Sequence, residues 1–205
     1  MQNEKWLQWI IELQGLAQAG LFYSNNKFDL ERFQRIREIS AEMLQAQSDL
    51  PLARITQLFC NETGYQTPKI DTRAAIFQGD QILLVQEENG LWALPGGWCD
   101  VIATVKENVV KEVKEEAGLD AVAEFVIALQ DHAKNNPPAL AHNVCKVFIY
   151  CRATGGEFMP NSETLASGYF PLHDLPPLAT GKTTEAQIKM CFQAHQAEHW
   201  QTIFD

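Results

Sequence analysis

Three glutamates, Glu112, Glu115 and Glu116, are spaced i, i+3 and i+4 in a segment with a helical pattern of apolar residues. On a helix this spacing places the three carboxylates on one patch, where like charges repel each other. A cation between them would remove the repulsion, and hard divalent ions prefer carboxylate oxygens. The spacing therefore indicates a site for Mg²⁺ or Mn²⁺. The alternative is a solvated helix face whose charge is partly offset by neighbouring lysines.

The residues around these glutamates favour the metal site over the solvated face. Gly96 and Gly97 precede the segment, and adjacent glycines allow tight turns and a close approach of the backbone to a ligand. Gly118 follows it and is a typical helix-ending residue. The apolar residues of the segment would share one helix face, and they are Val105, Val109, Val110, Val113 and Ala117.

This segment resembles the Nudix box, GX5EX7REUXEEXGU, in which U is aliphatic. With the opening glycine at Gly97, the box matches at Glu112, Val113, Glu115, Glu116, Gly118 and Leu119. Two positions depart from the pattern, because Ala103 replaces the first glutamate and Lys111 replaces the arginine. Lys111 keeps the positive charge but lacks the planar fork that orients a carboxylate. Glu107, on the same helix, is a candidate to substitute in part for the missing carboxylate.

The resemblance extends to a subgroup that hydrolyses nucleoside diphosphates linked to another moiety, such as ADP-ribose and CDP-choline. It implies attack of water on phosphorus, yielding a nucleoside monophosphate and a phosphorylated product, with ADP-ribose ahead of CDP-choline as substrate. It also implies that Glu112, Glu115 and Glu116 hold the metal, together with a carbonyl of Gly96 or Gly97. Two alternatives are a non-catalytic nucleotide-sensing module and a nucleoside triphosphate sanitiser that would release pyrophosphate.

Further candidates lie outside the box. Glu163, in a late loop, is the first candidate for a general base, and the alternative is an ordinary exposed carboxylate. Arg73 is a candidate to contact a phosphate, or else to form a surface ion pair with Asp71. Trp98 is a candidate to stack on a base, with core packing as its alternative. Asp100 is expected to cap the loop before the helix, and the alternative is that it helps to place the metal.

The elements that must position these side chains fall into two regions. Helical spacing within residues 4–17 and again from Leu30 to Leu44, with Asp29 as the N-cap of this second helix, predicts two helices. With a short third helix opened by Pro51, they form a predicted small all-α domain over residues 1–60. Residues 60–68 are typical of a linker. A hairpin over 74–85, strands over 121–129, 144–153 and 169–172, and helices over 104–117 and 184–199 follow. We therefore expect an α/β (α+β) domain over residues 69–205, which the resemblance identifies as a Nudix α/β/α sandwich with a mixed sheet.

The composition limits the possible partners. The chain has 205 residues with 16 Lys and Arg against 26 Asp and Glu, so its formal net charge is −10. This balance argues against binding of a nucleic acid polymer, which needs an excess of positive charge. The five cysteines form no CxxC pair, and no apolar stretch reaches the roughly 18 residues of a membrane span. We expect a cytoplasmic protein that binds a small nucleoside diphosphate-X molecule, and the resemblance implies a homodimer.

Other patterns are weaker. Gly181-Lys182-Thr183 resembles the end of a phosphate loop, but Pro176 stands where that motif needs its first glycine. The segment from His195 to His199 matches a reversed zinc-protease pattern, although an amphipathic terminal helix explains it better. The remaining histidines are expected to lie in solvated loops, and they are His132, His142 and His173.

Overall fold

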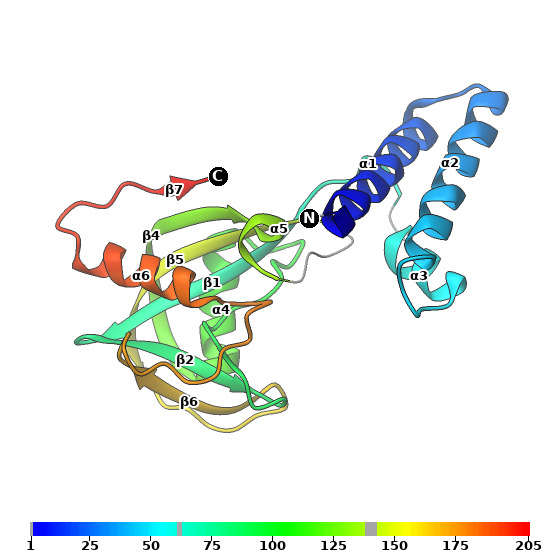
Figure 1. Ribbon diagram of the computed structural model, residues 1–205. Helices are drawn as coiled ribbons and strands as arrows, with labels where there is room; N and C mark the ends of the chain where they lie inside the picture. The colour runs from blue at the N-terminus through cyan, green and yellow to red at the C-terminus, as the bar shows by residue number, and fades with distance from the viewer. Residues whose placement is uncertain (1, 61–62, 138–142) are drawn as a thin grey trace. The chain divides into compact units, whose positions relative to one another are not determined.

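The computed structural model describes residues 2–60, 63–137 and 143–205 of the chain (Figure 1). It contains two compact units, one within residues 1–68 and the other within residues 69–205. No helix among the described residues is long and apolar enough to cross a membrane.

The first unit consists of α1 (Gln2–Tyr23), α2 (Lys27–Gln45) and α3 (Leu52–Phe59). Its core is small and includes Ile10, Ala41, Ile55 and Phe59. As expected from the sequence, α3 begins directly after Pro51.

The start of α2 differs from the prediction that Asp29 caps it. The N-cap is Asn26, whose side-chain oxygen accepts the backbone N–H of Phe28 at 2.9 Å. Asp29 lies in the first turn instead and pairs with Arg32. A carboxylate is favourable in the first turn as well as at the N-cap, because the helix dipole is positive there. Both positions therefore favour the same residue types, which explains the error.

The second unit is built on a mixed sheet. Its strands are β1 (Lys69–Gln78), β2 (Gln81–Glu87), β3 (Trp92–Ala93), β4 (Leu119–Asp131), β5 (Val144–Gly156), β6 (Thr164–Phe170) and β7 (Ile203–Phe204). The order across the sheet is β3-β2-β1-β5-β4-β7, and β6 pairs with β2. β1 and β2 form the predicted antiparallel hairpin, whereas β1 runs parallel to β5. The mixed sheet that the resemblance implied is thus confirmed.

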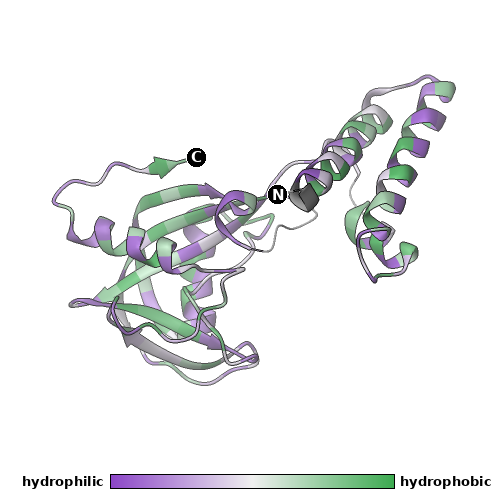
Figure 2. Cartoon of the chain, viewed as in Figure 1, coloured by the Kyte–Doolittle hydropathy of each residue, from purple (hydrophilic) through white to green (hydrophobic). Residues whose placement is uncertain are grey.

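A helix covers each face of this sheet. Because successive strand residues point to opposite faces, Ala74 and Ile76 of β1 pack against Val109 of α4 (Val105–Ala117). Ala75 lies on the other face, with Ile188 of α6 (Glu185–Gln196). Apolar residues accordingly predominate along the central strands, while the helices carry polar residues on their outer sides (Figure 2). This is the expected α/β/α sandwich.

The C-terminal third shows two differences from the predicted elements. The strand expected over 169–172 instead runs over Thr164–Phe170, where Pro171 ends it because proline has no N–H to donate to the sheet. The last helix ends at Gln196, and the short strand β7 follows it. The shift of β6 matters for the site, because it places Glu163 directly before a strand.

Candidate active site

The N-terminus of α4 is fixed by a capping box. The Thr104 hydroxyl accepts the backbone N–H of Glu107 at 3.2 Å, and the Glu107 carboxylate accepts the backbone N–H of Thr104 at 2.9 Å. Thr104 is therefore the cap, and the expectation that Asp100 caps this region is wrong. Oε2 of Glu107 is engaged in this box, and the substitution of Glu107 for the carboxylate that Ala103 lacks stays a prediction.

The loop before α4 is tied to β1 through its backbone. Thr72 N–H donates to the Gly97 carbonyl and Ala74 N–H donates to the Pro95 carbonyl, each at 2.8 Å. Gly96 has a φ of 143°, and a Cβ there would lie 1.9 Å from the Thr72 carbonyl oxygen. Only glycine fits this close approach. The same loop aims the Gly96 N–H at the Glu116 carboxylate, which accepts it at 2.7 Å.

Gly97 makes room for a carboxylate. A Cβ at this residue would lie 2.9 Å from Oε2 of Glu112, so a side chain would push that group away. The Gly97 carbonyl, expected as a metal ligand, already accepts the N–H of Thr72. A carbonyl oxygen has two lone pairs, so its role as a metal ligand stays a prediction, and Gly97 also leaves the space that Glu112 occupies.

The box glutamates differ in burial. Glu112 is only 8% exposed, Glu116 is half-buried and Glu115 is exposed. Burial raises the pKa of Glu112, and it raises the pKa of Glu116 to about 7. A buried carboxylate is stabilised in its charged form when a cation is close.

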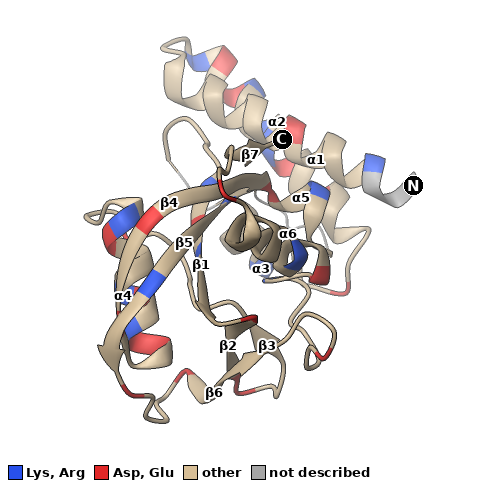
Figure 3. Ribbon diagram, turned by 90° about the vertical axis from the view of Figure 1, so that its left-hand side faces the viewer, with Lys and Arg blue, Asp and Glu red and all other residues tan. Residues whose placement is uncertain are grey.

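Lys111, in place of the box arginine, contacts three carboxylates. Its Nζ lies 2.7 Å from Oδ2 of Asp100 and 3.6 Å from both Oε1 of Glu112 and Oε2 of Glu115. These acids raise the pKa of Lys111. Figure 3 shows positively and negatively charged positions close together along the ribbon of α4. An ammonium between the carboxylates shows that this patch favours a cation.

These residues fit a divalent metal ion by chemistry. The possible metal ligands are the carboxylates of Glu112 and Glu116, whose burial disfavours their charged forms. A bound cation would stabilise these charged forms. Within the described residues, no group of three or more His, Cys, Asp or Glu side chains is already gathered closely enough to hold one ion. Binding would therefore require side-chain adjustment, for which the exposed Glu115 has freedom.

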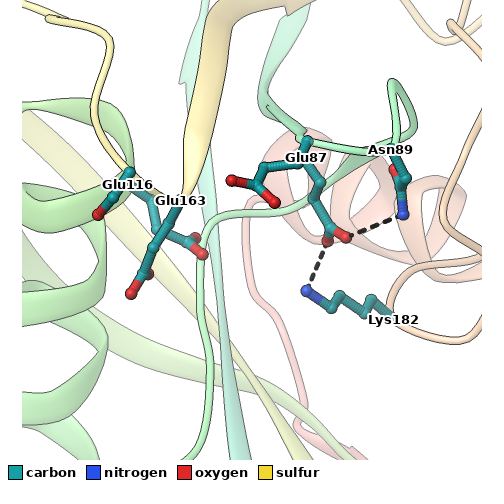
Figure 4. A pocket seen from close by; sticks show the side chains of 7 residues that line it. Glu87, Asn89, Glu116, Glu163 and Lys182 are labelled. Carbon is teal, nitrogen blue, oxygen red and sulfur yellow. Dashed lines mark hydrogen bonds and ion pairs between the residues drawn. The ribbon is translucent and has the colours of Figure 1, made fainter.

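A pocket of about 660 Å³ opens beside Glu116. Figure 4 shows Glu116 and Glu163 on one side of it, with Glu87, Asn89 and Lys182 on the other. Its lining consists of Glu87, Glu88, Asn89, Glu116, Ser162, Glu163 and Lys182.

The position of Glu163 is fixed by its neighbour Asn161. The Asn161 side chain accepts the backbone N–H of Glu163 at 2.9 Å and donates to the backbone carbonyl of Glu115 at 2.9 Å. The Glu163 loop is thereby attached to the end of α4, and the Glu163 side chain is exposed in the pocket that Glu116 lines. The structure thus brings the two carboxylates into one pocket.

Arg73 is buried rather than exposed in the pocket. It is 4% exposed, and its guanidinium donates to both oxygens of Asp71, at 2.8 and 3.0 Å, and to the Leu94 carbonyl at 3.2 Å. Lys146, on β5, also contacts Asp71 at 2.7 Å. The expected ion pair with Asp71 is therefore confirmed, but it is buried instead of lying at the surface. The contact with the Leu94 carbonyl means that this cluster supports the loop that begins at Leu94.

Trp98 is 51% exposed, so the alternative that it packs in the core is wrong. It forms an isolated bridge with Asp71 at the edge of β1. A ring with this exposure can contact a bound molecule.

Sequence reasoning placed His132 in solvent, which is also wrong. His132 is 5% exposed and its Nε2 lies 3.0 Å from the Gly181 carbonyl oxygen. His173 is exposed as expected, and His142 lies outside the described residues. Sequence reasoning also missed Glu87 and Lys182 as pocket residues. The signal for Lys182 was the Gly181-Lys182-Thr183 segment, which does not match a phosphate loop but does reach the pocket.

Comparisons with known proteins agree with this architecture. Residues 4–59 match a family model described as a UDP-X-like, N-terminal oligomerisation domain, and residues 67–190 match the NUDIX domain. YjhB of Bacillus subtilis, which carries a provisional assignment as an ADP-ribose pyrophosphatase, is 40% identical over 98% of this chain and 97% of its own length.

Two solved structures are also similar. An ADP-ribose pyrophosphatase from Streptococcus suis is 65% identical, covers 68% of this chain and all of its own chain, and has a TM-score of 0.64. A UDP-X diphosphatase is 28% identical, covers 97% of this chain and 98% of its own, and also has a TM-score of 0.64. Because the NUDIX match spans more than half of the sequence and relatives match along most of it, the chain belongs to the Nudix hydrolase family.

Proposed function

We propose that this chain hydrolyses the pyrophosphate bond of a nucleoside diphosphate linked to another moiety, with ADP-ribose as its first substrate. The observation that carries the proposal is that Glu116 joins two groups: it contacts the glycine loop beside the buried Glu112, and it lines one pocket with the exposed Glu163. The names of the B. subtilis and S. suis relatives support ADP-ribose as the substrate.

Glu112 and Glu116 would hold a divalent ion, Mg²⁺ or Mn²⁺, with Glu115 joining from the solvent side. When bound, the ion would neutralise the diphosphate and stabilise the charge that develops on its oxygens. The Gly96 N–H fixes one oxygen of Glu116, which leaves its other oxygen for the ion.

The remaining groups would bind the substrate and activate water. Glu163 would accept a proton from the attacking water as the oxygen–phosphorus bond forms and the anhydride bond breaks. The nucleoside monophosphate and the phosphorylated second moiety would then leave. Trp98 is exposed enough to stack on the base.

A UDP-linked molecule is the second candidate substrate. The observation in its favour is that the likeness to the UDP-X diphosphatase extends over 97% of this chain, including the N-terminal unit. CDP-choline remains a third member of the panel that tests the proposal.

The test is a substrate panel with products identified by mass, run with Mg²⁺, with Mn²⁺ and with a chelator. We expect AMP and ribose 5-phosphate from ADP-ribose, and we expect the chelator to stop the reaction. Release of pyrophosphate from nucleoside triphosphates, with no cleavage of linked diphosphates, would instead identify a triphosphate sanitiser. Binding of ADP-ribose without turnover would indicate the nucleotide-sensing module.

A further inference from the structure

We infer that Lys182 binds the diphosphate of the substrate and that Glu87 holds the lysine in place while the pocket is empty. The inference rests on the proposed function, because it assigns a residue to the binding of that substrate. The starting observation is the segment Gly181-Lys182-Thr183, which does not match a phosphate loop but brings Lys182 to the pocket.

The backbone on both sides of Lys182 is held by buried side chains. His132 contacts the Gly181 carbonyl at 3.0 Å, and Asn136 donates to the Thr180 carbonyl at 2.8 Å. On the other side, the hydroxyl of the fully buried Thr183 accepts the N–H of Leu94 at 3.1 Å. The segment is thus attached to the start of the glycine loop. Because its neighbours are fixed, Lys182 is presented to the pocket from a defined position.

The charged residues that line the pocket make Lys182 the candidate to bind phosphate. Among the described residues that line it, Lys182 alone is positively charged, and four of the others are glutamates. Two other basic residues near the box are already engaged. Arg73 is buried against Asp71 and the Leu94 carbonyl, and Lys111 contacts Asp100 and two box glutamates.

The ammonium of Lys182 has more N–H donors than its contact with Glu87 uses. Its Nζ lies 2.7 Å from Oε1 of Glu87, while a lysine ammonium carries three N–H donors. The Lys182 side chain is 48% exposed, so a ligand can reach the other donors. Figure 4 shows the side chain extended toward Glu87 on the side of the pocket that faces Glu116 and Glu163. A diphosphate between these sides would receive a charge-assisted hydrogen bond from Lys182.

The Glu87 contact suggests an alternative, in which Lys182 only stabilises the pocket wall. The two roles predict opposite effects of replacing Glu87. If Lys182 binds phosphate, Glu87→Gln frees the lysine and removes a negative charge from the pocket, so substrate binding is unchanged or tighter. If the ion pair is only structural, Glu87→Gln and Lys182→Gln cause the same loss.

The experiment measures kcat and KM for ADP-ribose with Mg²⁺, and the dissociation constant of inorganic pyrophosphate by calorimetry. We expect Lys182→Gln to raise both KM and the dissociation constant about tenfold, because a charge-assisted contact to phosphate is lost, with a smaller change in kcat. Lys182→Arg should restore most of the binding, and Glu87→Gln should leave both constants equal or lower. Lys189→Ala, which changes an exposed lysine of α6, is the matched control.

Two outcomes would overturn the inference. One is a Lys182→Gln protein that binds pyrophosphate as tightly as the wild type. The other is an equal loss in Lys182→Gln, Glu87→Gln and the double variant, which would show a structural ion pair. If the wild-type protein cleaves no linked diphosphate, the proposed function fails. The pyrophosphate measurement still reports on Lys182 in that case.

Discussion

The two less exposed box glutamates, Glu112 and Glu116, are the residues on which the proposed chemistry depends most. A glutamine in either place keeps the size of the side chain but removes the charge that would bind the metal ion. We expect Glu112→Gln and Glu116→Gln each to lower kcat by about 100-fold or more, as expected for loss of a metal ligand. Circular dichroism should show an unchanged fold. Glu185→Gln, on the exposed start of α6, is the control and should retain wild-type turnover.

The buried environment of Glu116 also predicts how stability depends on pH in the metal-free protein. Burial raises the pKa of this carboxyl to about 7, whereas a glutamate in an unfolded chain titrates near pH ~4.3. Between these values the folded state binds more protons than the unfolded state. The free energy of unfolding therefore decreases as the pH rises, by about 1–3 kcal/mol in total.

Urea unfolding at about pH 5 and pH 8 in the presence of EDTA measures this dependence. Glu116→Gln should remove most of the difference between the two pH values, since the amide does not titrate. Mg²⁺ should reduce the loss at high pH in the wild type, because it binds the charged carboxylate. An equal pH dependence in wild type and variant would show that another group is responsible.

Glu163 allows a test of the general base. Its side chain is exposed in the same pocket as Glu116, and its backbone is held by Asn161. If Glu163 accepts the proton of the attacking water, Glu163→Gln should lower kcat and flatten the acidic limb of the pH–rate profile. A variant that keeps the wild-type acidic limb would exclude Glu163 from this role. Glu157→Gln, an exposed glutamate before the same loop, is the control.

At the scale of elements, the capping box of α4 makes a separate contribution to stability. Thr104→Ala removes the hydroxyl that accepts the Glu107 N–H, and we expect a loss of about 1 kcal/mol in the free energy of unfolding. Thr104→Ser keeps the hydroxyl and should lose much less. Chemical unfolding of the three proteins gives the comparison. Equal stabilities would mean that tertiary packing of α4 hides the effect of the cap.

The elements near the box could be predicted because their signals are local. The helical period and Gly118 place α4 from a single stretch of sequence, and the turn at Gly79 places the β1–β2 hairpin in the same way. The burial of Arg73 could not be predicted, because it depends on Lys146, which the parallel pairing of β1 and β5 brings to Asp71 from 75 residues away. Contacts of this range follow from strand order, which a local pattern does not contain.

The same limit applies to the pocket. The sequence identified Glu112, Glu115 and Glu116 through their helical spacing and Glu163 through its loop. It did not join Lys182 to Glu87, because these residues meet only when the segment before α6 passes the end of β2. The box glutamates could therefore be identified from the sequence, whereas the residues on the opposite side of the pocket could be identified only from the fold.

At the scale of the whole molecule, we propose that the two units are separate domains, over residues 1–60 and 69–205. The second has two apolar cores, one on each face of its sheet. The first has one small core and leaves large apolar side chains of α1 exposed. These are Trp6, Trp9, Leu16, Phe22 and Tyr23, with exposed fractions from 41% to 67%. Apolar residues on α1 and α2 are visible in Figure 2.

These exposed side chains support the expectation of a homodimer, since apolar patches of this kind are typical of interaction surfaces. The family model that matches residues 4–59 is described as an oligomerisation domain, which agrees with that expectation. We predict that the full chain sediments as a dimer and that a chain starting at residue 67 sediments as a monomer. Replacing Trp9 and Phe22 with glutamate should also give monomers, because buried charges would oppose association. Glu31→Gln, an exposed charge on α2, is the control. Dimers that persist after removal of residues 1–66 would place the interface on the second unit instead.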